Sequence, residues 1–312
     1  MSDHHGGDAS GGPADDSRAV LLVTHTGRGE ATSSARVAAK RLLAAGLTVR
    51  VPRSEAAALD VDGVQVVDAV TEAAVGSELV MVLGGDGTIL RGAEFARGSA
   101  AALLGVNLGH VGFLAEAEQE DLTAVVDRIV ARAYVVEERM TLDVTVLREG
   151  SEHARTWAVN EASVEKQSRE RMLDVVAEVD GRPLSRWGCD GVVCATPTGS
   201  TAYAFSAGGP VVWPQVQALL MVPLSAHALF ARPLVVAPTS VLAVELADRT
   251  AAGVLWCDGR RMVELRPGDR VEVRKGVEPL RLARLQTPPF TDRLVRKFDL
   301  PVDGWRGRSS RT

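Results

Sequence analysis

One carboxylate lies inside a glycine-rich stretch that follows an apolar run. The stretch is GGDGT, Gly84 to Thr88, the carboxylate is Asp86, and the preceding run is Leu79 to Leu83. Glycines after a buried strand let backbone N–H groups approach a ligand, and a helix that starts there favours an anion. A carboxylate repels nearby phosphates unless it holds Mg²⁺ or accepts a hydrogen bond from a hydroxyl group that attacks phosphorus. Asp86 therefore indicates phosphoryl transfer.

The residues after this stretch exclude two common nucleotide loops. No Gly-Lys-Ser or Gly-Lys-Thr sequence follows, and Leu90 stands where the third glycine of G-x-G-x-x-G would fall after Gly85 and Gly87. The alternative interpretation is an ordinary glycine turn before a helix that Asp86 or Thr88 caps.

A second dense stretch, CDGVVCATPTGSTAYAFSAGGP, runs from Cys189 to Pro210. A strand leads into a Pro-Thr-Gly turn, after which Ser200 and Thr201 are placed to cap a short helix, so that N–H and hydroxyl groups converge. The ring of Tyr203 in this helix could stack on a base or pack in the core.

Two polar residues, Asn160 and Glu161, end the apolar run that begins at Thr156. An amide beside a carboxylate can hydrogen-bond the amino edge of adenine and a ribose diol. A surface turn is the alternative interpretation of such a pair.

Other polar residues are open to structural explanations. Asp-Gly pairs begin at Asp180, Asp190 and Asp258, and at least one of the three must be a purely structural turn. His227 lies between apolar segments, which favours a packed core or interface histidine over a residue of a site.

The first part of the chain must position GGDGT by an alternation of strands and helices. Strands are predicted at Ala19–Thr24, Leu47–Val51, Glu78–Leu83 and Ala102–Asn107, and helices at Ala31–Ala45, Ile89–Arg97 and Gln119–Arg132. Continuous apolar strands that alternate with helices are typical of an α/β domain with a mainly parallel sheet.

From about Tyr134 the pattern changes to short strands separated by turns. Strands are predicted at Leu142–Leu147, Ala154–Val164, Leu173–Val179, Gly191–Ala195, Leu234–Val236, Val241–Leu246, Gly253–Cys257, Arg270–Val273 and Leu280–Leu285. This part is predicted to be a β-rich, sandwich-like domain, with a last helix at Phe290–Phe298. We therefore expect a disordered tail at 1–17, the α/β domain at 18–137, the β-rich domain at 138–286, and a C-terminal helix and tail at 287–312.

Composition narrows the class of protein. The 312 residues are 46% hydrophobic and 24% charged, which indicates a soluble globular protein. A formal net charge of -5 and the lack of an apolar segment of roughly 18 to 20 residues argue against nucleic-acid and membrane partners. The N-terminus lacks the apolar core of a secretory signal, which favours the cytoplasm. Cys189, Cys194 and Cys257 have no metal-ligand spacing, so we expect small packed side chains and no metal site built from them.

Together, these stretches resemble the NAD kinase family, whose members phosphorylate NAD to NADP. The resemblance runs from about Arg18 to Gly307 and is carried by GGDGT, GVNLGHVGFLAE at Gly105–Glu116, Asn160-Glu161, the Cys189–Pro210 block, PLSAHALFARPL at Pro223–Leu234 and DGR at Asp258–Arg260. GGDGT alone also fits lipid kinases and phosphofructokinases, whereas its combination with TPTGSTAY is specific.

The resemblance implies roles for individual residues. Asp86 resembles the family's proton acceptor, which hydrogen-bonds the 2′-hydroxyl group of the adenosine ribose. The residues implied to bind NAD are Asp86, Gly87, Arg91, Asn160, Glu161, Arg171, Asp190, Thr201, Ala202, Tyr203, Ala204, Phe205 and Ser206. Those implied to bind the phosphate donor are Gly84, Gly85, Gly87 and Thr88, and further candidates are Phe113, His227 and Asp258. The sequence departs from the family at Gly188, where many members carry a cation, and at Arg260, where some carry glutamine.

The resemblance also implies a fold and a reaction. The fold is a phosphofructokinase-like α/β N-terminal domain, a β-rich C-terminal domain, and a last helix that packs on the first domain. The donor would be ATP or polyphosphate with Mg²⁺ or another divalent cation, and the enzyme would be a homodimer or homotetramer in which a neighbouring subunit completes the NAD pocket. The alternatives are a lipid or sugar kinase that shares the GGDGT loop, and an NAD-binding sensor without catalysis.

Overall fold

The computed structural model describes residues 18–107, 112–118, 122–286 and 289–302. The predicted tail at 1–17 lies outside the described residues, as does part of the GVNLGHVGFLAE motif at 108–111. Within the described residues, no helix is long and apolar enough to cross a membrane.

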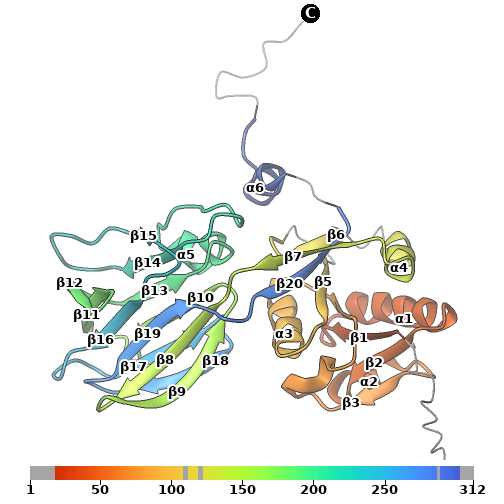
Figure 1. Cartoon of the computed structure of the whole chain (residues 1–312), viewed down its shortest axis with the longest axis horizontal. Helices are drawn as coiled ribbons and strands as arrows, with labels where there is room; N and C mark the ends of the chain where they lie inside the picture. The colour runs from red at the N-terminus through yellow and green to blue at the C-terminus, as the bar shows by residue number, and fades with distance from the viewer. Residues whose placement is uncertain (1–17, 108–111, 119–121, 287–288, 303–312) are drawn as a thin grey trace, which may run out of the picture.

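The first domain is built on an eight-stranded sheet with the order β3-β2-β1-β4-β5-β20-β7, in which β6 also pairs with β5 (Figure 1). All pairings are parallel except that of β20 with β7. The strands are β1 (Ala19–Thr24), β2 (Thr48–Pro52), β3 (Gln65–Val67), β4 (Leu79–Leu83), β5 (Ala102–Asn107), β6 (Ala115–Glu118), β7 (Val135–Arg139) and β20 (Leu280–Arg284).

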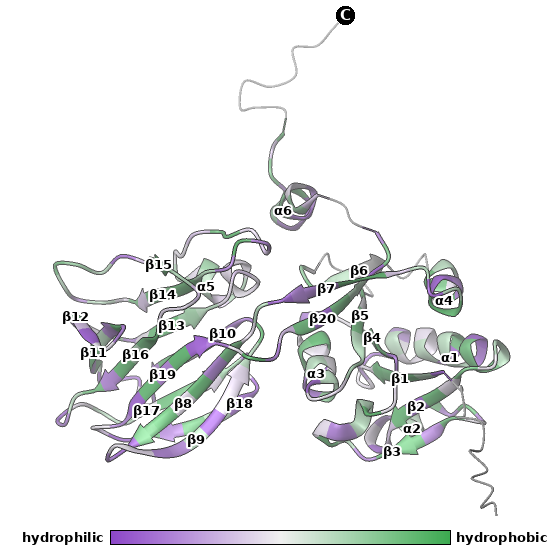
Figure 2. Cartoon of the chain, viewed as in Figure 1, coloured by the Kyte–Doolittle hydropathy of each residue, from purple (hydrophilic) through white to green (hydrophobic). Residues whose placement is uncertain are grey.

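Helices cover both faces of this sheet. They are α1 (Gly29–Ala44), α2 (Arg53–Leu59), α3 (Asp86–Ala96) and α4 (Leu122–Val130), with a short 3₁₀ helix, η1 (Thr71–Ala74). The buried side chains of α1 and α4 pack with one face of the sheet, and those of α3 pack with the other. The central strands are therefore hydrophobic along their length, whereas β7 (VVEER) becomes hydrophilic toward its end (Figure 2). The predicted mainly parallel α/β domain is confirmed.

The second domain consists of two six-stranded antiparallel sheets. One has the order β15-β14-β13-β10-β17-β18 and the other β12-β11-β16-β19-β8-β9. The first contains β10 (Glu161–Lys166), β13 (Gly191–Ala195), β14 (Leu219–Leu224), β15 (Leu234–Val236), β17 (Gly253–Cys257) and β18 (Arg261–Leu265). The second contains β8 (Leu142–Arg148), β9 (Ser151–Ala158), β11 (Leu173–Val179), β12 (Arg182–Cys189), β16 (Leu242–Leu246) and β19 (Arg270–Lys275). Their facing side chains form one core around the fully buried Trp187, as expected for a sandwich.

Two strand predictions need correction. The run Ala154–Val164 is not one returning strand, because the chain leaves β9 at Ala158 and enters β10, in the other sheet, at Glu161. Val159 between them packs in the first domain's core. The strand predicted at Leu280–Leu285 exists as β20 but lies in the first sheet, because Leu282 is in register with Leu103 of β5. That strand was wrongly assigned to the β-rich domain; the other domain boundaries stay predictions.

The last helix, α6 (Phe290–Phe298), contacts both domains. Arg293 Nη1 donates to the carbonyl oxygens of Phe113 and Ala115 at 3.2 and 3.0 Å. The ring of Phe298 stacks on that of Phe205 in the second domain, with 4.5 Å between the centroids. The predicted contact of this helix with the first domain is therefore present, together with a second contact that the sequence does not indicate.

Candidate active site

The glycine loop lies at the carboxyl edge of the first sheet, between β4 and α3. Helix α3 begins at Asp86, and Gly85 occupies the N-cap position without a side-chain hydrogen bond. The alternative in which Asp86 or Thr88 caps this helix is therefore wrong. Gly84 has a φ of +154°, and a Cβ atom added to it would lie 2.7 Å from Thr88 Oγ1. The first glycine is needed for this close packing, which leaves the following N–H groups at the helix start facing outward.

The Asp86 carboxylate is only partly accessible. Its Oδ1 atom is buried and has no hydrogen-bond partner among the described residues. A Cβ atom added to Gly112 would lie 2.4 Å from this oxygen, so the backbone of Gly112 lies directly against it. A buried carboxylate oxygen without a partner is costly unless a ligand satisfies it. Gly112 was not singled out from the sequence, although it lies in the quoted GVNLGHVGFLAE motif.

A cavity of about 460 Å³ opens in front of the glycine loop. Its lining carries positive side chains and no carboxylate among the described residues: His25, Thr26, Arg28, Gly85, Gly87, Thr88, Arg91 and Arg260. Together with the start of α3, these groups suit a polyphosphate. The sequence did not indicate His25 and Arg28, but β1 pairs in parallel with β4, so the residues after β1 must lie beside the glycine loop.

Arg91 lines this cavity, and its guanidinium group is fixed by contacts with Thr24 and Glu55. Its Nη2 atom donates to the Thr24 carbonyl oxygen at 2.9 Å and pairs with the Glu55 carboxylate. Glu55 is buried and also accepts a hydrogen bond from the Thr24 N–H group at 2.6 Å. Burial raises the pKa of Glu55 to about 6, against the opposing effects of that hydrogen bond and of Arg91. These contacts fix the position of Arg91 at the cavity wall.

The turn at Asn160 is held by a buried carboxylate. Asp258 is 8% exposed and accepts hydrogen bonds from the N–H groups of Val159 and Asn160 at 2.9 and 2.7 Å. The Asn160 carbonyl oxygen accepts a bond from the Thr196 N–H group at 2.9 Å. Asn160 and Glu161 are themselves 8% exposed, so the surface-turn alternative is wrong.

The second dense stretch packs directly against this turn. A Cβ atom added to Gly199 would lie 2.0 Å from the Asn160 carbonyl oxygen, so only glycine fits there. The Thr196 hydroxyl donates to the Val159 carbonyl oxygen at 2.7 Å and accepts from the Gly199 N–H group at 3.0 Å. The two predicted stretches therefore form one unit.

Glu161 has an unusual environment. Burial, followed by the nearby Asp258 carboxylate, raises its pKa to about 8, although a hydrogen bond from the Tyr203 backbone acts in the opposite direction. Its Oε2 atom is buried without a hydrogen-bond partner among the described residues. This environment favours the neutral carboxylic acid over the carboxylate, and the neutral acid can both donate and accept a hydrogen bond.

The predicted NAD-binding segment from Thr201 to Ser206 spans the end of a 3₁₀ helix, η3 (Gly199–Thr201), and α5 (Tyr203–Ser206). Ala204 is fully buried, whereas the rings of Tyr203 and Phe205 are 37% and 40% exposed. The core-packing alternative for Tyr203 is therefore wrong, and its ring is available for stacking.

The remaining candidates lie farther along the second domain. Asp190 pairs with Lys166 at 2.5 Å, which lowers the pKa of its carboxyl group, with smaller effects from Ser225 and His227. His227 is exposed, so the core interpretation does not hold for it. Arg171 is exposed in the loop between β10 and β11, and the structure does not bring it to the glycine loop.

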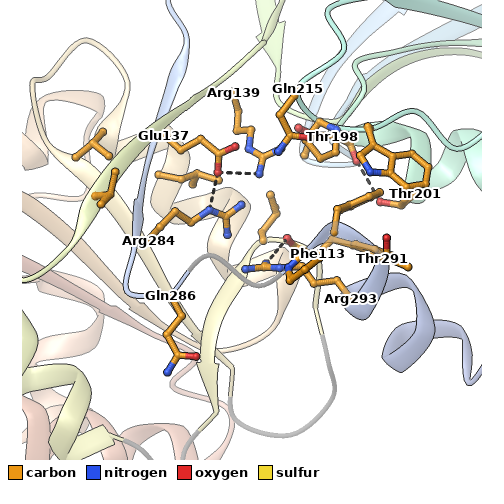
Figure 3. A pocket seen from close by; sticks show the side chains of 18 residues that line it. Phe113, Glu137, Arg139, Thr198, Thr201, Gln215, Arg284, Gln286, Thr291 and Arg293 are labelled. Carbon is orange, nitrogen blue, oxygen red and sulfur yellow. Dashed lines mark hydrogen bonds and ion pairs between the residues drawn. The ribbon is translucent and has the colours of Figure 1, made fainter.

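A second cavity, of about 530 Å³, lies between the two domains and α6 (Figure 3). It brings Phe113 together with Thr198 and Thr201 from the second dense stretch. Arg139 and Arg284 both contact Glu137 on its wall. The sequence did not indicate these charged residues, because their strands β7 and β20 are distant in the chain.

The cysteines are structural. Cys189, Cys194 and Cys257 are buried, and burial raises their pKa to about 11, 12 and 12. Cys189 and Cys194 lie in different strands, β12 and β13. The Asp180-Gly181 pair, with φ of 54° and 71°, is the hairpin turn between β11 and β12.

Known proteins share this fold and these motifs. Residues 20–134 match the model of the ATP-NAD kinase N-terminal domain, and residues 159–285 match that of the ATP-NAD kinase C-terminal domain. A protein from Thermobifida fusca strain YX named NAD kinase is 63% identical over 302 residues, which cover 94% of this chain and 93% of the relative.

Solved structures of NAD and NADH kinases have a similar fold. An NAD kinase from Archaeoglobus fulgidus in complex with ATP is 25% identical, with a TM-score of 0.68 over 91% of this chain and 100% of the other. A yeast NADH kinase complexed with NADH has a TM-score of 0.80 at 24% identity over 95% of this chain and 90% of the other, which supports the fold. The chain therefore belongs to the NAD kinase family and is an enzyme of that type.

Proposed function

We propose that this chain transfers the terminal phosphoryl group of ATP to the 2′-hydroxyl group of the adenosine ribose of NAD, with Asp86 at the reacting centre. The observation that carries this assignment is the buried Oδ1 atom of Asp86, which has no hydrogen-bond partner among the described residues and lies at the start of α3 beside a cationic cavity. A hydroxyl group of a bound acceptor would satisfy that oxygen.

The donor phosphates occupy the cavity in front of the glycine loop. The N–H groups at the start of α3 and the hydroxyl group of Thr88 contact the phosphate oxygens beside Gly85 and Gly87. Gly84, the other predicted donor residue, shapes the turn, because its N–H group donates to the Val106 carbonyl oxygen at 3.0 Å. Arg28 adds positive charge from the rim of the cavity, which His25 and Arg260 also line. Because phosphoryl transfer depends mainly on positioning and on stabilising charge, these groups supply much of what the reaction needs.

A divalent cation fits this arrangement only if phosphate oxygens supply most of its ligands. The cavity lining has no carboxylate among the described residues, and Asp86 is the acidic group nearest in sequence to its glycines. Mg²⁺ typically keeps several waters and uses one or two carboxylates plus substrate phosphates. When bound with ATP, the cation would neutralise charge on the transferring phosphoryl group.

NAD is held by the second domain. Asn160 and the neutral Glu161 hydrogen-bond the adenosine part, and the exposed ring of Tyr203 lies beside it. Ala202, Ala204, Phe205 and Ser206 line the same pocket with Thr201, while Asp190 and Arg171 act toward the nicotinamide half, in part from a neighbouring subunit of a homodimer or homotetramer. We place this enzyme in the cytoplasm, where NAD and ATP are available.

The chemical step then follows from the placement of Asp86. Its carboxylate accepts a hydrogen bond from the 2′-hydroxyl group and takes its proton as the oxygen attacks the γ-phosphorus. The new bond joins the ribose oxygen to phosphorus, and the bond from that phosphorus to the β–γ bridging oxygen breaks, which gives NADP and ADP.

The test is an assay of the purified protein with NAD, Mg²⁺, and ATP or polyphosphate in turn, read with an NADP-specific dehydrogenase. Asp86→Asn should bind NAD normally by calorimetry and lose about 10²- to 10⁴-fold in kcat. Gly112→Ala, which pushes on the same carboxylate, should also lower kcat. Asp86→Asn with near-normal turnover would contradict the role of Asp86, and NAD binding without any NADP formed would favour a sensor.

A further inference from the structure

A cluster of charged side chains joins the helix that carries Asp86 to the second domain. Glu94, on α3, pairs with Arg260 at 2.8 Å and with Arg261. Both arginines belong to the hairpin of β17 and β18, which also contains Asp258. These contacts cross the junction between the two halves of the candidate site.

Arg261 makes the largest number of different contacts in this cluster. Besides Glu94, its Nη2 atom contacts the Asp258 carboxylate and the Trp157 carbonyl oxygen at 2.9 and 2.8 Å. Its guanidinium group also lies over the Trp157 ring, 4.5 Å from the centroid. Arg97, near the end of α3, lies over the same ring at 4.2 Å. Two guanidinium groups on one indole ring add cation–π contacts to the ion pairs of the junction.

The cluster continues into the substrate-binding turn. Asp258, which Arg261 contacts, is the residue whose carboxylate accepts hydrogen bonds from the N–H groups of Val159 and Asn160. At the other end, Glu94 lies eight residues after Asp86 on α3, or about 12 Å along the helix axis. A continuous path of contacts therefore runs from α3 through Arg261 and Asp258 to Asn160.

We propose that Arg261 is a positioning residue that fixes the helix bearing Asp86 relative to the Asn160–Glu161 turn, so that the acceptor hydroxyl group meets the donor phosphate in line. This inference rests on the proposed function. Its basis is geometric: one guanidinium fork binds a carboxylate on α3 and a carboxylate that organises the turn. A displacement of about 1 Å between reacting groups can cost about a hundredfold in rate, so such a connection affects turnover more than affinity.

The chemistry of arginine is essential to this role. A lysine would keep the positive charge but would supply a single point of contact in place of the planar fork that reaches Glu94, Asp258 and the Trp157 carbonyl oxygen at once. It would also lose the flat contact with the indole ring. Arg261→Lys therefore keeps the positive charge and removes the planar set of contacts, so it tests which of the two the role requires.

Glu94→Gln tests the contact between α3 and Arg261 without changing the residues that hold the Asn160 turn. This change removes the ion pairs of Glu94 with Arg260 and Arg261 but leaves the bonds of Arg261 to Asp258 and Trp157 in place, and the KM of ATP reports any effect through Arg260 at the donor cavity. The NAD-binding turn then keeps its structure, so the dissociation constant of NAD should stay within about twofold of the wild type while kcat falls about tenfold.

The experiment measures kcat, the KM of each substrate, the NAD dissociation constant and Tm for the wild type, Arg261→Lys, Glu94→Gln and the double variant. Arg261→Lys should lower kcat about tenfold to a hundredfold well below its Tm, and the double variant should be no worse than the poorer single variant, because both remove one connection. The matched control is Arg186→Gln, which removes an exposed arginine–carboxylate pair with Asp174 in the same domain and should leave kcat unchanged.

Each outcome decides between a positioning role and a purely structural one. If Arg261→Lys and Glu94→Gln lower Tm but keep the wild-type kcat, the cluster only stabilises the fold and the inference is wrong. Additive losses of kcat in the double variant would also contradict a single connection. A wild-type protein that forms no NADP would instead refute the proposed function, so the two failures are distinguishable.

Discussion

The two halves of the candidate site are built in opposite ways. In the glycine loop, Gly87 is exposed, and a Cβ atom added to Gly85 or Gly87 would meet no atom within 4 Å. At the Asn160 turn, a Cβ atom on Gly199 would lie 2.0 Å from a backbone oxygen, and the side chains of Asn160 and Glu161 are buried.

The difference follows from what each half must recognise. A polyphosphate chain is attracted by cations and N–H groups over several ångströms, so the donor half can remain open and still bind it. The acceptor half must instead direct one ribose hydroxyl group, which requires polar atoms held at fixed positions by buried contacts. Substitutions in the donor half should therefore change the KM of the donor, whereas substitutions in the acceptor half should change stability and NAD binding.

The largest contrast is expected between two glycine substitutions. Gly199→Ala drives a methyl group into the Asn160 backbone, so it should destabilise the protein by about 3 kcal/mol or more and abolish measurable NAD binding. Gly87→Ala meets open space, so the fold and the NAD affinity should be retained, and the new methyl group should instead hinder the donor and raise its KM.

Thermal melting, calorimetry with NAD and steady-state kinetics measure this pair. A normal Tm for Gly199→Ala would show that the turn is less tightly packed than its contacts indicate. A loss of NAD affinity in Gly87→Ala with normal donor KM would reverse the assignment of the two halves.

A smaller effect is expected from the cations of the donor half. Arg28 is exposed at the cavity rim, so Arg28→Gln should raise the KM for ATP by only about threefold and leave the NAD dissociation constant unchanged. Added salt should raise the KM of the wild type more steeply than that of the variant, because the lost interaction is screened.

The matched control for this prediction is Arg53→Gln. Arg53 is an exposed arginine of the same domain, paired with Asp68 and absent from the cavity lining. Equal KM values for Arg28→Gln and Arg53→Gln would remove Arg28 from the donor site.

Much of the first domain could be predicted from local sequence. β1 and β5 have the predicted limits, because strands buried on both faces are continuous apolar runs with clear ends. The glycine loop was found for a similar reason: its function depends on five consecutive residues. The neighbouring residues His25 and Arg28 could have been added from the parallel pairing alone.

The parts that failed depend on contacts between distant segments. The run from Ala154 to Val164 has the composition of one strand. It is divided where Val159 packs in the other domain and where the N–H groups of Val159 and Asn160 donate to the Asp258 carboxylate. Likewise, β20 has no local feature that assigns it to the first sheet. The structural importance of Asp258 was hidden because an Asp-Gly pair first indicates a turn, which it also forms, with φ of 54° and 62°.

A third contrast tests the buried character of the acceptor half through pH. The folded pKa of Glu161 is about 8, raised from the ordinary 4.5, so folding favours its protonated form. Its contribution to stability is full below the unfolded pKa and decreases as the pH rises toward 8. Glu161→Gln mimics the protonated acid at every pH, so the Tm of the wild type relative to this variant should fall by about 5 °C or more between about pH 5 and about pH 9. Scanning calorimetry across this range measures the difference, and a constant gap would mean that Glu161 is ionised in the folded protein and that the acceptor half is as open to water as the donor half.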